Sequence, residues 1–266
     1  MEARTPSSRS RRRRPIALTE RDLRLLAFAA AHRFVLPGQI ALLERIGEAK
    51  ADTRLRTLHD GGYVHRERLL HGTPPAHRIT AAGLRAVGSE LPVPRRPDLA
   101  TYRHEAAVGW LMLLALRGRF GPVTDVVSER RMRSHDGRTT ERSERFGVRL
   151  GGVGPGGRER LHHPDLLALT TSGHRVAFEL ELTTKSPARR EQILAAYGAD
   201  SRIDAVVYLV ERTAAARAIQ RSASRAGVSD LVLVQRASLK PPASRGGARS
   251  VAQRIQSRQH GPEAGR

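Results

Sequence analysis

Three stretches of helical periodicity precede two short alternating stretches in the first third of the chain. Thr19 and Asp22 resemble an N-cap and an acidic first turn, and apolar residues then recur at helical spacing to about His32. Pro37 suits the first turn of a second helix, which Gly47 would end. The spacing predicts a buried face on the first helix, formed by Leu23, Leu26, Ala27 and Ala30.

The third stretch predicts a helix from about Ala49 to His59, with Ala51, Leu55 and Leu58 on its core face. Two glycines, the stretch YVHRERLL, a turn at HGTPP and the stretch AHRIT follow, which is typical of two short strands joined by a turn. Three helices followed by such a hairpin resemble the winged helix-turn-helix fold. We therefore expect residues 18–88 to form a DNA-binding domain of that kind.

The resemblance implies roles for several polar side chains of this domain. Its third helix would enter the major groove, and the hairpin would form the wing. The same fold also serves as a protein–protein module, which remains the alternative. The expected DNA-binding residues are Lys50, Thr53, Arg54 and Arg56 on the helix and Arg66 and Arg68 on the wing.

A second domain follows a linker at residues 89–100, where SELPVPRRPD has no apolar periodicity. An apolar helix is expected from about Arg103 to Leu116, and VTDVVSERRMR is expected to form a strand. Residues 134–160 lose all periodicity and read as a flexible connection, because their GGVGPGG lacks the GK[ST] of a phosphate loop. Strands and helices then alternate to residue 236, which predicts an α/β domain over residues 101–238.

The most informative part of this domain is a predicted hairpin, HHPDLLAL, TTSGH and RVAFELELTTK. If its turn is centred on Ser172, Asp165 lies across from Glu179, and Glu181 shares the face of Glu179. Opposed carboxylates repel unless a cation or a proton lies between them, and Mg²⁺ prefers such oxygen ligands. The alternative is an ordinary amphipathic strand whose glutamates face water.

Charge narrows the range of partners. The chain of 266 residues has a formal net charge of +21, with 47 Lys and Arg residues against 26 Asp and Glu residues. This sign favours a polyanion such as double-stranded DNA. The basic segments at residues 1–17 and 239–266 are expected to be a disordered arm and a disordered tail, which could follow phosphates or simply aid solubility.

Two absences narrow the class of protein. The chain has no cysteine, which excludes disulfides, thiolate metal sites and a cysteine nucleophile. No stretch approaches the ~18 to 20 apolar residues that a membrane helix needs, so we expect a cytoplasmic protein.

The motifs PDLLAL and FELELTT, within this order of elements, resemble the PD-(D/E)XK nuclease superfamily. The whole of residues 18–236, a winged helix followed by such a domain, is similar to the replication-relaxation family of plasmid and mobile-element proteins. The resemblance implies an α/β nuclease-like fold, a mixed sheet flanked by helices, and a setting in plasmid replication or DNA relaxation.

Matched residue by residue, the superfamily pattern implies that Asp165 and Glu179 hold Mg²⁺, or Mn²⁺ in its place. Glu181, a further metal or catalytic candidate, stands where the superfamily usually has lysine. Lys185 is the candidate for a migrated lysine, if it reaches the carboxylates. Weaker candidates are Glu105 as a further ligand, His162 and His163 as phosphate contacts, and Gln192 and Tyr197, whose spacing does not match the helper motif of RecB-like nucleases.

Three functional hypotheses follow from these residues. The first is a metal-dependent DNA endonuclease or nickase. The second is a non-catalytic DNA-binding replication or transfer factor with a degenerate nuclease-like domain, which the missing motif lysine favours. The third is a winged-helix transcription regulator with an unrelated effector domain.

Overall fold

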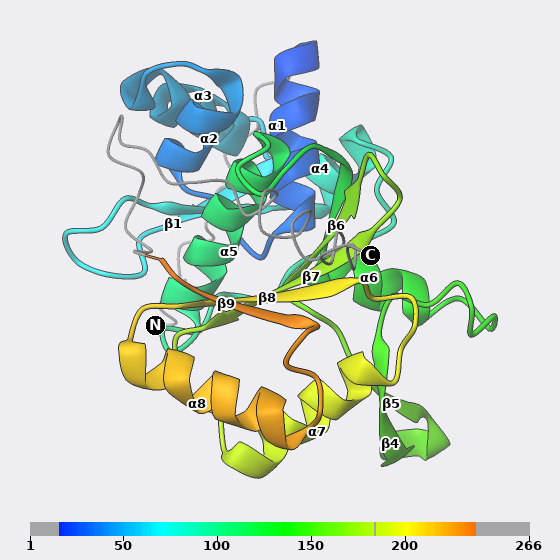
Figure 1. Ribbon diagram of the computed structural model, residues 1–266. Helices are drawn as coiled ribbons and strands as arrows, with labels where there is room; N and C mark the ends of the chain where they lie inside the picture. The colour runs from blue at the N-terminus through cyan, green and yellow to red at the C-terminus, as the bar shows by residue number, and fades with distance from the viewer. Residues whose placement is uncertain (1–15, 184, 238–266) are drawn as a thin grey trace, which may run out of the picture. The chain divides into compact units, whose positions relative to one another are not determined.

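A computed structural model describes residues 16–183 and 185–237 of the chain (Figure 1). The predicted basic tail, and all but the last two residues of the predicted basic arm, lie outside this range. The chain divides into two compact units, Met1–Arg96 and Pro97–Arg266. It is a mixed α/β protein, and each unit is described by itself.

The first unit contains three helices, a hairpin and a short fourth helix. Its core is formed by apolar side chains from all of these elements, among them Leu26, Ile40 and Leu55, together with Phe34 between α1 and α2. Strands β1 and β2 pair antiparallel. The elements are α1 (Glu20–Ala31), α2 (Pro37–Glu44), α3 (Glu48–Asp60), β1 (Val64–Glu67), β2 (Ala76–Ile79) and α4 (Ala81–Ala86).

The first helix starts as predicted but buries a different face. Thr19 and Asp22 form a reciprocal capping box, in which the Thr19 side chain accepts from the Asp22 backbone N–H. The predicted face is wrong in part, because Leu23 is 38% exposed and Ala27 is also exposed. Asp22 is fully buried, and the apolar stripe is therefore rotated toward Leu25, Phe28 and Ala29.

The junction between α2 and α3 also differs from the prediction. Helix α2 ends at Glu44, because Arg45 adopts a left-handed conformation with φ of 54°. Gly47 is the N-cap of α3 rather than the end of α2. The core face predicted for α3 is confirmed, since Ala51, Leu55 and Leu58 are fully buried.

His77 of β2 makes the stability of the first unit sensitive to acid. Its ring is fully buried, neither ring nitrogen has a hydrogen-bond partner among the described residues, and burial lowers its pKa to about 4. The unfolded chain binds a proton near pH 6.5, so stability is full above that pH and falls until the folded form is protonated near pH 4.

We expect this histidine to cost about 3 kcal/mol of unfolding free energy as the pH falls from 6.5 to 4. Urea unfolding at several pH values, compared between the wild type and His77→Leu, measures the difference, because the leucine side chain cannot titrate. Equal pH slopes for the two proteins would contradict the expectation.

The second unit is a five-stranded mixed sheet with helices on both faces. The strand order is β3-β6-β7-β8-β9, with β3, β6 and β7 antiparallel and β7, β8 and β9 parallel. The strands are β3 (Val123–Ser128), β6 (Leu166–Thr170), β7 (Arg175–Glu181), β8 (Ala205–Val210) and β9 (Val232–Arg236).

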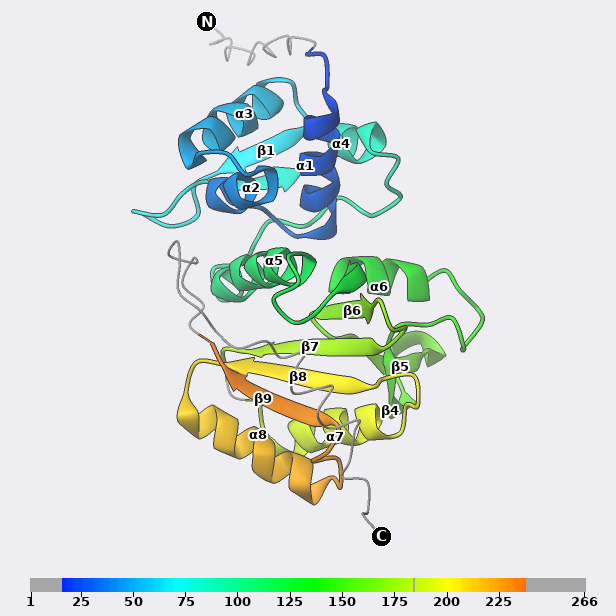
Figure 2. The same ribbon diagram turned by 45° about the horizontal axis from the view of Figure 1, so that its top comes forward.

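Helices α7 (Pro187–Gly198) and α8 (Thr213–Arg225) lie side by side along one face of this sheet (Figures 1 and 2). Helix α5 (Tyr102–Leu116) packs on β3, β6 and β7 from the other face. Side chains of β7 alternate between the two faces. Phe178 contacts the ring of Phe120 on the α5 side, and Glu179 faces α7.

The predicted hairpin has the predicted register. Leu166 pairs with Phe178 and Leu169 with Arg175, so the turn is centred on Ser172. Turn residues and alternation are local signals, and for this reason the sequence alone was sufficient here.

The segment between β3 and β6 differs from the prediction. The expected strand ends at Ser128, whose hydroxyl caps α6 (Glu129–Asp136). The stretch expected to be a flexible connection contains β4 (Val148–Val153), the 3₁₀ turn η1 (Pro155–Gly157) and β5 (Glu159–His162), and the two strands form an antiparallel pair. This hairpin is mostly exposed and glycine-rich, so it lacks the apolar alternation by which strands are recognised.

None of the helices in the described parts of the chain is both long enough and apolar enough to span a membrane.

Candidate functional site

The two glutamates of β7 are buried rather than exposed to water. Glu179 is 2% exposed and Glu181 is 4% exposed. A buried carboxylate is costly unless cations and hydrogen-bond donors surround it. The burial overturns the alternative of an ordinary amphipathic strand and requires that each glutamate have partners.

Glu179 is surrounded by three donors. The Tyr197 hydroxyl donates to Oε1 at 2.6 Å, and Nε2 of His162 lies 2.5 Å from the same oxygen. The Lys185 ammonium is 3.6 Å from Oε2. Burial alone would raise the pKa of Glu179, but the charge and hydrogen bond of His162, with Lys185 and Tyr197, hold it well below its usual value. Glu179 is therefore ionised at neutral pH.

Glu181 is held by a different set of groups. The Arg190 guanidinium, itself 2% exposed, donates to Oε1 at 3.3 Å, and the Lys185 backbone N–H donates to the same oxygen at 3.2 Å. The Lys185 ammonium lies 3.6 Å from Oε2. Arg190 also donates to the Lys185 carbonyl at 2.8 Å and so fixes the segment that carries the lysine.

Lys185 reaches both carboxylates from its place beyond β7. Its ammonium lies at the same distance, 3.6 Å, from Glu179 and from Glu181, and its side chain is 34% exposed. Burial lowers the pKa of this lysine, but Glu179, Glu181 and then Asp165 outweigh that effect and raise it. A charged lysine is thus available beside the predicted carboxylates.

Asp165 lies where β6 begins. Its Oδ2 accepts the Leu180 backbone N–H at 2.7 Å and lies 3.2 Å from Nε2 of His104. Burial lowers the pKa of His104, but the hydrogen bond and charge of Asp165 outweigh it and raise that pKa. The α5 residue in contact with Asp165 is His104, the neighbour of the predicted Glu105.

Sequence reasoning gives too little weight to some residues and misses others. The spacing of Tyr197 from Gln192 argues against a role for either, yet Tyr197 binds Glu179, while Gln192 donates to the Leu150 carbonyl at 3.0 Å. Arg190 and His104 are not indicated by any motif. A basic residue one helical turn after a helix start is a weak signal, and only the fold brings it to Glu181.

His162 and His163 point apart, as expected for neighbours on a strand. His162 faces Glu179, and Nε2 of His163 lies 2.9 Å from Oδ2 of Asp136. The two histidines therefore belong to different polar clusters.

The donor chemistry of the site bears on metal binding. Across residues 16–183 and 185–237, no three His, Cys, Asp or Glu side chains are grouped so as to hold a metal ion. Mg²⁺ commonly uses one or two carboxylates together with water and substrate phosphate. Asp165, which directly precedes β6, and Glu179, on the neighbouring strand β7, fit that requirement, and Oε1 of Glu181 accepts from Arg190.

The residues predicted to bind DNA lie mainly on α3, and some of them have structural partners. The Arg54 guanidinium forms a bidentate pair with the fully buried Asp22, and Arg56 pairs with Asp52. Lys50 is exposed, and the exposed Thr53 donates its hydroxyl to the Ala49 carbonyl. Arg66 lies on β1 and is half-buried, whereas Arg68 lies just beyond β1 and is exposed.

Lys50, Thr53 and Arg54 line one groove with the start of α1. Its volume is about 960 Å³, and its far side is formed by Thr19, Glu20 and Arg24. The groove lies entirely within the first unit.

No protein-family model matches the sequence, and no curated protein matches it significantly.

Proposed function

We propose that this protein binds double-stranded DNA through its first unit, as a winged helix, and cleaves one DNA strand in its second unit, as a Mg²⁺-dependent nuclease of PD-(D/E)XK type. The proposed setting is plasmid replication or DNA relaxation, as in the replication-relaxation family. The order of elements in each unit and the positive net charge support this proposal.

The observation that carries the proposal is the position of Lys185. Glu181 occupies the place of the usual lysine, but the ammonium of Lys185 returns to 3.6 Å from Glu179. The site therefore combines a carboxylate just before β6, a carboxylate on β7 and one cation beyond the end of β7.

Each side chain has a separate task in this proposal. Hydrolysis adds a water oxygen to phosphorus and releases an alcohol after protonation of its oxygen. Lys185 can neutralise negative charge that develops on the phosphate, and Tyr197 and His162 fix the orientation of Glu179. Asp165 and Glu179 would hold Mg²⁺, which supplies charge neutralisation and activation of water when bound.

The test is a nicking assay on supercoiled plasmid with Mg²⁺ or Mn²⁺. We expect conversion to open circles that stops when EDTA removes the metal. Metal-independent nicking, or intact plasmid at protein concentrations that saturate the DNA, would rule out the proposed catalysis.

A non-catalytic DNA-binding factor is the second candidate, and a specific observation favours it. Arg190 and Lys185 already neutralise Glu181, and Lys185, His162 and Tyr197 satisfy Glu179 without a metal. Such a site could be purely structural. Full DNA affinity without any nicking would identify this candidate.

Binding by α3 can be tested with Lys50→Ala/Thr53→Ala. Both side chains are exposed, so their removal should weaken binding to duplex DNA without unfolding the unit, with a reduced dependence on salt. Fluorescence anisotropy on a labelled duplex measures the effect, which we expect to be about 10-fold at moderate salt when one phosphate contact and one polar contact are removed.

Arg54→Ala provides the contrast for this test. It leaves the buried carboxylate of Asp22 without its bidentate partner, so its main effect should be a lower melting temperature. Unchanged affinity in Lys50→Ala/Thr53→Ala would contradict the placement of α3 in the DNA groove.

A further inference from the structure

A second polar site lies in the second unit, away from Glu179. It is a groove of about 930 Å³ lined by residues of α6, of the β4–β5 hairpin, of the segment that joins them and by Arg189 of α7. Seven arginines line it, against two carboxylates, those of Asp136 and Glu159. The groove is thus strongly positive.

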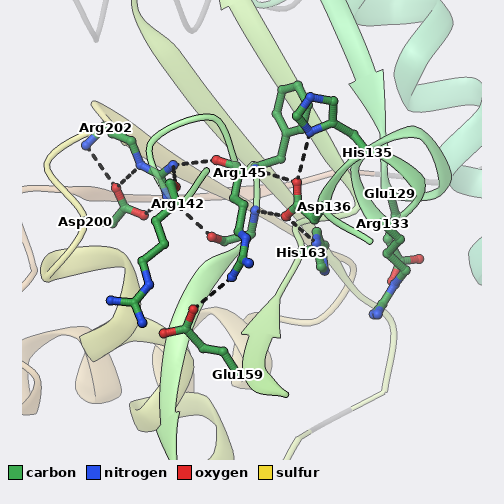
Figure 3. Close-up of polar contacts among 12 residues, drawn as sticks. Glu129, Arg133, His135, Asp136, Arg142, Arg145, Glu159, His163, Asp200 and Arg202 are labelled. Atoms are coloured by element: carbon green, nitrogen blue, oxygen red, sulfur yellow. Dashed lines mark hydrogen bonds and ion pairs between the residues drawn. The ribbon is translucent and has the colours of Figure 1, made fainter. Parts of the chain in front are cut away.

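Both carboxylates already have partners within the fold (Figure 3). Asp136 accepts the backbone N–H groups of Phe146 and Gly147, each at 2.8 Å, and pairs with His163. Burial would raise the pKa of Asp136, but these contacts, that of His163 first, lower it to about 2. Glu159 pairs with Arg145 at 3.1 Å and with Arg149.

Besides Asp136, Arg202 also holds the segment before β4 in place. Arg202, oriented by Asp200 at 2.6 Å, donates to the carbonyl oxygens of Arg142 at 3.3 Å, Ser143 at 3.2 Å and Gly147 at 3.4 Å (Figure 3). These bonds and those to Asp136 order this wall of the groove. Its arginines are therefore presented by a fixed backbone, which reduces the entropic cost of binding.

Three arginines of the groove have no partner that would account for their charge. Arg142, Arg158 and Arg160 are exposed, and within the described range none of their guanidinium groups makes an ion pair or a side-chain hydrogen bond. Like charges gathered on one surface repel, and a polyanion relieves that repulsion. The planar guanidinium also matches phosphate oxygens in a bidentate manner.

The other lining residues favour contact with the sugar–phosphate backbone rather than with bases. The described lining includes leucine, valine and glycine but no Phe, Tyr or Trp on which a base could stack. His163 also lines the groove, and its buried Nδ1 has no hydrogen-bond partner among the described residues.

We propose that this groove binds the phosphodiester backbone of the DNA on which the protein acts, with Arg142, Arg158 and Arg160 as the contacting residues. This inference rests on the proposed function, since it takes DNA as the ligand. The groove then supplies affinity that does not depend on base sequence.

The salt dependence of DNA binding by the full chain tests the groove. For B-DNA, the magnitude of the slope of log K against log salt decreases by about 0.9 for each phosphate that the protein no longer neutralises. Arg158→Ala/Arg160→Ala should therefore reduce that magnitude by about 1.8 relative to the wild type. The matched control is Arg217→Ala/Arg221→Ala, which removes two exposed arginines from α8 and should leave the slope nearly unchanged.

The slopes of the two double variants distinguish three outcomes. A clear drop in slope for the groove pair alone supports the proposal, provided that melting temperatures match the wild type. Equal slopes for the two pairs overturn the groove while leaving the proposed function in place, because Lys50→Ala/Thr53→Ala tests α3 separately. A wild type that does not bind DNA overturns both.

Discussion

In the variant Asp165→Ala/Glu179→Ala, Mg²⁺-dependent nicking of supercoiled plasmid is expected to fall by at least about 1,000-fold, to the level of the buffer. These two carboxylates are the ones to which the proposal assigns the metal. Affinity for DNA should be unchanged or higher, since two negative charges near the bound phosphates are removed. Gel assays of nicking and anisotropy of binding measure the two effects.

Folding must be controlled in this experiment, because Glu179 also accepts bonds from Tyr197 and His162. The isosteric variant Asp165→Asn/Glu179→Gln keeps the volume and several hydrogen bonds while removing the charge. Asp125→Ala/Glu191→Ala removes two carboxylates that form ion pairs near the surface of the same unit and should nick normally. Undiminished nicking by both Asp165→Ala/Glu179→Ala and Asp165→Asn/Glu179→Gln would exclude Asp165 and Glu179 as the metal ligands.

Replacing Arg190 by alanine should lower the free energy of unfolding by about 3 to 5 kcal/mol. The guanidinium is almost fully buried and donates to Glu181 and to the Lys185 carbonyl. Its removal leaves a buried carboxylate with a single, more distant cation. Urea unfolding followed by circular dichroism measures the change.

Two further variants separate charge pairing from a simple reduction in volume. Arg190→Met/Glu181→Gln removes both charges and should recover most of the stability, because the desolvation cost is removed together with the attraction. Arg225→Ala breaks an ion pair between α7 and α8 whose side chains are 53% and 33% exposed, and it should cost less than about 1 kcal/mol. A destabilisation in Arg190→Ala no larger than that in Arg225→Ala would show that Glu181 tolerates burial without its arginine.

The parts of the fold predicted from sequence are those with local signals. The β6–β7 register followed from one turn and one alternating strand, and α7 began where Ser186 and Pro187 indicate a helix start. The β4–β5 hairpin was not predicted, because glycine and arginine dominate its sequence. Its strands bury few side chains, so periodicity carries no information there.

The candidate site was predicted only along the strand that carries it. The alternation of side chains along β7 places Glu179 and Glu181 on one face, but the same alternation occurs whether that face is buried or exposed to solvent. Burial came from α7, whose Tyr197 is 18 residues beyond Glu179 in the chain. Such contacts depend on how a helix packs on a sheet, and no short-range rule describes them.

His162 and His163 give the short segment before β6 a fixed length. At the end of β5, His162 contacts Glu179, and the next residue, His163, points the other way and contacts Asp136. Inserting or deleting one residue between His163 and Leu166 would shift His162 relative to β6 and β7 and so disturb its contact with Glu179. The tip of the β4–β5 hairpin is exposed at Gly151, Gly152 and Val153, and neither histidine contact depends on its length. We therefore expect insertions and deletions in related sequences to occur at the tip of the β4–β5 hairpin and not between His163 and Leu166.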